Sequence, residues 1–439
     1  MGRGRIRKLI IPLILEQLLA VTVGFFDTFM VSRVGEAAVS GVALVDSINL
    51  LIIQVMTAFA AGGIVVISQY IGQKNDHLSK ETARHLEILI NAFSIFVMVV
   101  FLLLGDGILK LLFGKIEQDV MNAAVIYLKV TAVSFVFWGM YTSGASILRC
   151  QEDTKTPMVI SFLMNVLNVL LNALFVFGLH MGVLGVAVAT LISRGIAGIV
   201  MKGVLLSSRN QLRLINSDRK ISGAIFKSIL SMGIPSGVEN GMFHLGKLAL
   251  TSVISTLGTT AIAANSISYQ IIEFPNIPAG TIGLALVVIV GQDIGAGKKE
   301  EAVKDTKYML RLAFICDWVC KITLFFVAPV IVSFFNLSPE ASSMAIQVLR
   351  IFSIVSLFIW PLSYTLPNAL RGAGDVKYSM LGSIISMWIG RVIVSYVLIT
   401  YFGLGILGVW IGMFVDWFGR GGAYLYRFLS SKWLDKKAI

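Results

Sequence analysis

The sequence contains the same series of landmarks twice, about 223 residues apart. Pro12 matches Pro235 (235 − 12 = 223), and each is followed four residues later by an acid, Glu16 and Glu239. The same offset, to within one residue, aligns two more pairs of segments: residues 69–72 with 292–295, and Leu148-Arg149 with Leu370-Arg371. A fixed offset of this kind is the signature of an internal duplication. We therefore expect two homologous halves, each with the same fold.

The chain is too apolar for an ordinary soluble domain, because 56% of its residues are hydrophobic and only 14% are charged. Apolar runs of about 20 residues, enough to cross a hydrocarbon core, fill both halves. The sequence predicts an all-α integral membrane protein with twelve transmembrane helices. The predicted spans of the first half are 10–32, 44–71, 88–104, 121–147, 157–178 and 183–206. Those of the second half are 225–255, 262–290, 308–334, 344–366, 380–402 and 406–428.

The distribution of lysine and arginine predicts the orientation, because basic loops are retained in the cytoplasm. With both termini placed inside, only Arg33, Lys110 and Lys115 fall in external loops. We expect a multi-pass protein of the plasma membrane with both termini cytoplasmic. The net charge of +12 then reflects topology, and no nucleic-acid partner is required. A cleavable signal peptide is disfavoured because Pro12 and Asp27 interrupt the first apolar run.

The predicted domain organisation is two lobes joined by a polar, basic linker. We assign residues 1–206 to an N-lobe with helices 1–6, residues 207–223 to a cytoplasmic linker, and residues 224–439 to a C-lobe with helices 7–12. Because six is an even number, both halves enter the membrane from the same side. The two lobes are therefore expected to be related by a parallel pseudo-two-fold axis along the membrane normal.

No motif for an enzymatic reaction stands out in the sequence. The nearest approach to a nucleotide-binding loop, residues 295–298, lacks the first glycine and the hydroxyl residue. Four scattered histidines give no metal cluster: His77, His85, His180 and His244. We expect no enzymatic activity and no cofactor. Uphill transport would then draw on a sodium or proton gradient.

Polar residues in the predicted first, fifth and sixth helices are the candidate ion-coupling site. Asp27 lies eleven residues after Glu16, close to three helical turns, so both share a face. The fifth helix carries Asn165, Asn168 and Asn172 on one stripe, and Thr190 follows on the sixth. Carboxylate and neutral oxygens suit a hard cation such as sodium, while a desolvated aspartate alone could take up a proton. The competing interpretation is that the asparagines only hold helices together.

The second half does not copy this set of residues. At the same offset Asp27 falls on Leu250, and Asn168 falls on Arg391 (391 − 168 = 223). An arginine repels a cation, so a single ion site is expected in the first half. We expect Arg391 to balance an acid such as Glu239 or Glu273, with Glu239 also a candidate cation partner for substrate.

Prolines mark the candidate hinges for a change of conformation. Pro12 and Pro235 occupy matching positions in the two halves, while Pro275 and Pro278 interrupt the eighth predicted helix beside Glu273. Proline removes a backbone donor and kinks a helix. We expect the eighth helix to be broken or kinked near the membrane centre.

Several motifs, in order and at the spacing of both halves, resemble the multidrug and toxic compound extrusion (MATE) family over essentially the whole chain. They are residues 26–31 with Pro12, 69–72, 148–149 with 153–154, Asn168 with 171–172, 182–190, 233–235 with 239–240, and 370–372 with 374–375. The resemblance implies two six-helix lobes, a cavity between them, and efflux of bulky organic cations driven by sodium or protons. It also implies that Asp27, Asn168, Asn172 and Thr190 bind the coupling cation.

The resemblance is incomplete in the second half. Glu239 matches the family's glutamate on the seventh helix, but residues 358–361 (Phe-Ile-Trp-Pro) lack the aspartate with which some members pair it. The interpretation that follows is a cation-coupled antiporter, working as a monomer in the lipid bilayer on small organic cations by alternating access. The alternative is a flippase-like exporter of an amphipathic or lipid-linked metabolite, which should show more basic residues along its cavity, with Lys247, Arg194 and Arg391 as candidates.

Overall fold

The fold is all-helical in the part of the chain that the structure, a computed structural model, describes. Residues 3–32, 34–114, 116–207, 212, 221–335, 337–436 and 438–439 are described, without the side chains of 3–7, 23–29 and 31–32. Within this part no strand occurs. The predicted all-α class is therefore confirmed.

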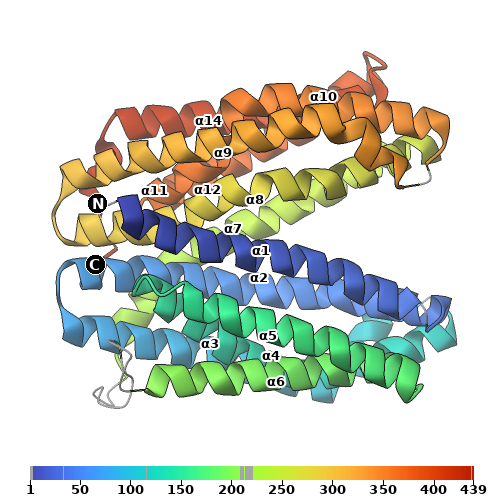
Figure 1. Cartoon of the computed structure of the whole chain (residues 1–439), viewed down its shortest axis with the longest axis horizontal. Coiled ribbons are helices and arrows are strands. Elements are labelled where there is room, and N and C mark those ends of the chain that lie inside the picture. Colours follow the sequence, from blue (N-terminus) through green and yellow to red (C-terminus); the bar gives the residue numbers. More distant parts are fainter. Residues whose placement is uncertain are drawn as a thin grey trace. The chain divides into compact units, whose positions relative to one another are not determined.

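Six helical rods form from the first half of the sequence (Figure 1). They are α1 (Arg3–Ser32), α2 (Glu36–Gly72), α3 (Asp76–Phe113), α4 (Gln118–Cys150), α5 (Lys155–Asn172) continued by the π-helical η1 (Ala173–Gly178), and α6 (Gly182–Leu206). Each contains the span predicted for it and most extend beyond that span, because the polar ends continue the helix past the hydrocarbon core.

Six more rods form from the second half, and two of them contain π-helical turns. Four uninterrupted helices are α7 (Gly223–Ser255), α8 (Thr259–Gly295), α9 (Lys299–Ser333) and α14 (Gly405–Leu429). The tenth rod joins α10 (Pro339–Trp360), η3 (Pro361–Thr365) and α11 (Leu366–Gly372); the eleventh joins α12 (Val376–Ile385), η4 (Ser386–Ile393) and α13 (Val394–Thr400). A short 3₁₀ turn, η5 (Lys432–Asp435), follows α14. Among the described residues, nine of the rods are long and apolar enough to cross a membrane.

The helix α8 runs without interruption through Pro275 and Pro278. A break of the helix at this place, one of the two expected outcomes, is therefore wrong, and a kink stays a prediction. Proline is tolerated inside membrane helices where neighbouring groups form hydrogen bonds to the backbone carbonyls that lose their donor. Just after the two prolines, the hydroxyl of Thr365 donates to the carbonyl of Ala279 over 2.8 Å, which fastens this stretch of α8 to η3. The hinge roles of these prolines, and of Pro12 in α1 and Pro235 in α7, stay predictions.

Backbone contacts divide the chain into two compact units, Gly2–Ile234 and Pro235–Ile439. The first turns of α7 belong to the first unit because they pack tightly on α2. A Cβ atom on Gly233 would lie only 2.8 Å from the carbonyl oxygen of Ala58. The N–H of Ser222, just before α7, also donates to Nε2 of His85 in α3 over 2.9 Å.

The core of the first unit lies where α2, α3, α4 and α6 meet, with fully buried side chains such as Leu86, Phe135 and Met201. Many large apolar side chains instead point outward, among them Leu103 at 77% exposure and Leu111 at 85%. Apolar surface on this scale is unsuited to water. It fits a bundle whose outer face is covered by acyl chains.

Candidate ion-coupling and charge sites

The two asparagines of α5 lie on one face of the helix, as their spacing predicts, and they form a hydrogen-bonded cluster with α6. Asn168 and Asn172, one turn apart on one face, are both buried, and Nδ2 of Asn172 donates to Oδ1 of Asn168 over 3.1 Å. Nδ2 of Asn168 lies 3.3 Å from Oγ of Ser193 and 3.5 Å from Oγ1 of Thr190. The structure thus brings together three of the residues predicted for ion coupling, and adds Ser193.

Asp27, the remaining predicted member of this site, lies in α1, and its side chain is outside the described part of the chain. The helix that carries it packs directly against α5, which carries Asn168 and Asn172. The half-buried Asn165 lies on the same helix α5. The roles of these residues in ion binding stay predictions.

Glu16 is held by an ion pair inside the first unit. Its Oε1 accepts from Nη2 of Arg149 over 2.7 Å and from the hydroxyl of Tyr141 over 2.9 Å, and the residue is 4% exposed. A buried carboxylate is stable only when such partners replace its water. Glu16 therefore joins α1 to α4, and its side chain does not extend toward the membrane–water interface.

Glu239 occupies the equivalent position in the second unit and has an equivalent partner. Its Oε1 accepts from Nη2 of Arg371 over 2.6 Å and from the hydroxyl of Ser383 over 2.5 Å. Arg149 and Arg371 are the pair that the sequence offset brings into register to within one residue (371 − 149 = 222). The same ion pair therefore occurs in both halves. Its sequence signal is that both the glutamates and the arginines match between the halves, to within one residue.

Arg391 contacts Asp416 of α14, so the expectation that it balances Glu239 or Glu273 is wrong. Its Nη2 lies 2.7 Å from Oδ2 of Asp416 and its Nε lies 2.9 Å from the same oxygen. Arg420 also donates to this oxygen over 3.0 Å. All three side chains are almost completely buried, so one carboxylate is shared by two guanidinium groups.

Tyr364 completes this cluster from η3. Its hydroxyl oxygen accepts from Nη2 of Arg420 over 2.6 Å and from Nε1 of Trp417 over 3.0 Å. Its ring also lies 4.2 Å from the guanidinium carbon of Arg420, a cation–π contact. These contacts partly offset the cost of burying an excess positive charge.

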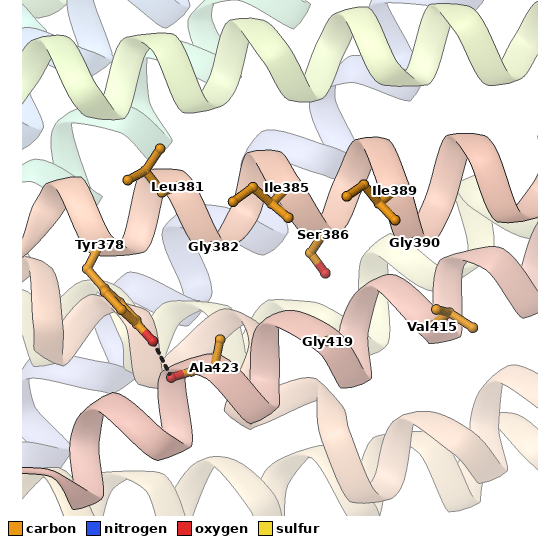
Figure 2. Close-up of a pocket in the computed structure, with 10 residues that line it drawn as sticks. All are labelled: Tyr378, Leu381, Gly382, Ile385, Ser386, Ile389, Gly390, Val415, Gly419 and Ala423. Carbon is orange, nitrogen blue, oxygen red and sulfur yellow. Dashed lines mark hydrogen bonds between the residues drawn. The ribbon is translucent and has the colours of Figure 1, made fainter.

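Close approach of η4 to α14 makes the Arg391–Asp416 contact possible. A Cβ atom on Gly390 would lie 2.9 Å from the backbone of Asp416, so any larger residue would separate the two helices. Beside this contact, α12, η4 and α14 form an apolar groove of about 540 Å³ (Figure 2). Figure 2 shows Leu381, Ile385 and Ile389 along one helix of the groove. No charged side chain lines it, so it does not suit an ion.

Glu273 lies on α8, at a second and more polar pocket of the same unit. This pocket of about 330 Å³ is lined from α7 by Lys247 and from α8 by Tyr269, Gln270 and Glu273. Glu273 is exposed, in contrast to Glu239. The pocket also borders the Arg391 cluster, because Lys247 and Arg391 both lie over the ring of Phe243.

Comparison with known proteins agrees with the duplication seen in the sequence. The MatE family model matches the chain twice, over residues 12–174 and 235–397, and the two matches begin 223 residues apart (235 − 12 = 223). Together they cover well over half of the chain. The protein belongs to the multidrug and toxic compound extrusion (MATE) family. It is therefore a member of a family of multi-pass membrane transporters, and the family assignment made from the motifs is confirmed.

Individual MATE relatives match along almost the whole chain. The probable multidrug resistance protein NorM of Thermotoga maritima is 29% identical over 445 residues, which cover 100% of this chain and 94% of that protein. The uncharacterized transporter YisQ of Bacillus subtilis is 25% identical, with 97% and 94% covered. A solved structure of a multidrug resistance MATE family transporter in an outward-facing conformation superposes with a TM-score of 0.90 at 23% identity, covering 98% and 94%. At this identity the superposition shows the fold.

The residues of this MATE protein that sequence reasoning missed are the partners of its buried charges. The offset of 223 places one of them, Asp416, opposite Ser193 (416 − 193 = 223), a match that became informative once the structure showed the contact between Asn168 and Ser193. The contact between Asn168 and Ser193 in the first unit is thus replaced by the contact between Arg391 and Asp416 in the second. Arg420 has no such signal, since its match in the first half is Ala197.

Proposed function

We propose that this MATE protein is a cation-coupled antiporter that exports bulky, mostly cationic organic compounds by alternating access. The observation that carries the proposal is the cluster on α5 and α6 of buried Asn168, Asn172 and Ser193 with half-buried Thr190. Of the two helices that carry this cluster, α5 packs against α1, which carries Asp27. An acid within a membrane helix beside a set of oxygen donors is a functional arrangement more often than a structural one.

The chemistry proposed for this site depends on the charge of Asp27. A sodium ion would be coordinated by the carboxylate of Asp27 with neutral oxygens from Asn168, Asn172 and Thr190. The hydroxyl of Thr190 donates to the carbonyl of Val186 over 3.1 Å and accepts from Nδ2 of Asn168 over 3.5 Å, which leaves one lone pair available to a cation. A proton would instead bind Asp27 directly. In both cases binding neutralises the charge of Asp27 and favours the inward-open state. The ion or proton then leaves to the cytoplasm in exchange for substrate.

Two buried acids of the second unit, Glu239 and Asp416, are unsuited to a second coupling ion, because arginine already neutralises them. Arg371 contacts Glu239, and Arg391 and Arg420 contact Asp416. A guanidinium next to the carboxylate repels a further cation. We therefore place the coupling site in the first unit alone, with one carboxylate, Asp27.

The proposed substrates are organic compounds with a bulky apolar part. The chain contains 27 Phe and 17 Met, which offer adaptable apolar contact surface. Relatives that share nearly the full length are described as probable multidrug resistance proteins, which supports the same substrate class.

The test of coupling is ethidium efflux from liposomes that contain the purified protein, under imposed gradients. Sodium coupling predicts efflux that depends on sodium at fixed pH, and proton coupling predicts efflux that depends on a pH gradient in sodium-free medium. We expect Asp27→Asn to abolish the response to the driving gradient. The matched control is Asp106→Asn, since Asp106 is exposed and its ion pair with Lys129 contributes little. Undiminished gradient-driven efflux by Asp27→Asn would contradict the proposal.

The flippase-like alternative would need basic side chains available to an acidic lipid-linked group. Arg391 is 1% exposed and bound to Asp416, and Arg194 donates to Ser134 over 3.0 Å while its guanidinium lies over Trp138. Of the three candidates, Lys247 alone lines a described pocket. This favours the exporter. Both cytoplasmic termini, the plasma-membrane location and a monomeric state stay predictions.

A further inference from the structure

The apolar groove along α12, η4 and α14 lies within the second unit (Figure 2). On α12 and η4 its lining extends from Tyr378 to Gly390, twelve residues (390 − 378 = 12) or about 18 Å of helix. Half of the hydrocarbon core of a bilayer is about 15 Å thick. The groove is therefore about as long as one leaflet is thick.

The floor of the groove is formed by small residues, at places where the two rods approach closely. A Cβ atom on Gly382 would lie 2.9 Å from the ring of Tyr424, and a Cβ atom on Gly419 would lie 2.9 Å from Oγ of Ser386. Glycine at these two places lets the helices touch and leaves a furrow between them. A furrow of this kind suits a narrow apolar chain.

One wall of the groove is an apolar row, Leu381, Ile385 and Ile389, spaced four residues apart (Figure 2). Each of the three side chains is between 52% and 57% exposed. Their rod, residues 376–400, is one of those that are long and apolar enough to cross a membrane. Acyl chains surround such a span in a bilayer, so they are what covers this row.

A lysine stands at one end of the apolar row. Lys377 lies four residues before Leu381, which places it on the same face of the helix, and it is exposed. It makes no ion pair with any acid in the described part of the chain. A lysine at the end of a membrane span extends its ammonium toward the lipid headgroups.

Arg427 of α14 lies at the same end of the groove. Its guanidinium carbon lies 4.8 Å from the ring centre of Tyr378, and the hydroxyl of Tyr378 donates to the carbonyl of Ala423 over 3.1 Å. Nε of Arg427 donates to Oδ2 of Asp375 over 2.6 Å. Because a guanidinium has five N–H donors, this one bond leaves its Nη groups available to a further acceptor.

We propose that this groove binds an anionic phospholipid, with one acyl chain along the apolar row and the phosphate at Lys377 and Arg427. Basic groups stand at one end and no charged side chain lines the groove itself, which matches the separation of phosphate and acyl chain in such a lipid. In the predicted orientation this end faces the cytoplasm, and anionic lipids of that leaflet attract basic residues. The site lies in the second unit, away from the proposed coupling site, so the inference goes beyond the export function.

The experiment measures lipid binding to the purified full chain in detergent by native mass spectrometry. The probes are phosphatidylglycerol and phosphatidylcholine with identical acyl chains, and glycerol 3-phosphate, which has the phosphate without an acyl chain. We expect phosphatidylglycerol to bind the wild type about tenfold more tightly than phosphatidylcholine, because the ammonium group of the latter offsets its attraction to Lys377. Glycerol 3-phosphate at the same concentration should not displace the bound lipid.

Two substitutions assign the two parts of the site. Lys377→Gln should weaken the binding of phosphatidylglycerol about tenfold and leave that of phosphatidylcholine unchanged. Ile385→Trp places a bulkier side chain over the groove and should weaken the binding of both lipids. The matched controls are Lys307→Gln and Ile322→Trp, at exposed positions of α9 outside the groove. Size-exclusion profiles and melting temperatures show whether each variant is folded.

Each possible outcome decides the inference. Equal affinity of the wild type for the two phospholipids, or an equal loss in Lys377→Gln and Lys307→Gln, overturns the anionic site. Unchanged binding of both lipids by Ile385→Trp overturns the position of the acyl chain, and displacement by glycerol 3-phosphate would show a phosphate site that needs no lipid. Gradient-driven ethidium efflux tests the proposed function separately, so the failure of one is distinguishable from the failure of the other.

Discussion

Arg391 contacts Asp416 over 2.7 Å at the two positions that Asn168 and Ser193 occupy in the first repeat. The first unit thus has a neutral hydrogen bond of 3.3 Å where the second has an ion pair. Duplication therefore preserved the geometry of this helix contact while its charge changed. The unit that retains neutral oxygen donors is the one to which we assign cation binding.

We expect Asp416→Asn to destabilise the protein more than either Arg391→Met or Arg420→Met. Removing the carboxylate leaves two buried guanidinium groups without a counter-ion, whereas removing one arginine leaves a neutral pair. Breaking a buried pair from one side costs about 3–5 kcal/mol. The measurement is the melting temperature of the three purified variants in detergent. If Asp416→Asn lowered the melting temperature less than the arginine variants do, the result would contradict a single carboxylate that neutralises two arginines.

A triple variant provides the matched rescue for this prediction. Arg391→Asn, Asp416→Ser and Arg420→Ala together rebuild the residues that the first repeat has at the matching positions. This variant has no unpaired charge in the cluster. We expect its melting temperature to lie above that of Asp416→Ser alone, as expected for strongly coupled neighbours.

Arg149→Met and Arg371→Met should each lower stability by a similar amount, about 2–3 kcal/mol. Each removes the arginine that neutralises a buried glutamate, Glu16 in the first unit and Glu239 in the second. The two distances, 2.7 Å and 2.6 Å, show that the repeat rebuilt the same pair. Chemical or thermal unfolding of each variant measures the effect, with the exposed Lys129→Met as control. A large loss for one and none for the other would mean that the two pairs differ in role.

Gly390→Ala is expected to destabilise the protein by about 1–3 kcal/mol, the usual cost of overpacking. Its Cβ would lie 2.9 Å from the backbone of Asp416, and neither helix has a flexible side chain end that can yield there. The matched control is Gly422→Ala on α14, where a Cβ would meet nothing within 4 Å. That variant should be neutral or slightly stabilising, because alanine favours a helix. Melting temperatures of the two variants compare these expectations directly, and equal values would contradict the close approach.

The architecture followed from the sequence because apolar length and the 223-residue offset are properties of single segments. The partners of buried charges did not, because each depends on which helices pack together. Arg391 reaches Asp416 because Gly390 lets η4 approach α14 closely. The two residues belong to different predicted spans, so neither span alone indicates the contact. The carboxamide stripe of Asn168 and Asn172 was predictable, since their spacing alone places them on one face.

Asn168→Ala distinguishes an ion site from a purely structural contact between α5 and α6. As an ion ligand, Asn168 contributes a carbonyl oxygen, so its loss should raise the half-saturating concentration of the coupling ion about tenfold, the effect of losing about 1.4 kcal/mol. As a helix contact alone, its loss would lower the melting temperature and leave that concentration unchanged. Ser193→Ala is the matched control, because it removes one hydrogen-bond partner of Asn168 and no proposed ligand. Gradient-driven ethidium efflux, titrated against sodium or pH for both variants, decides between the two roles.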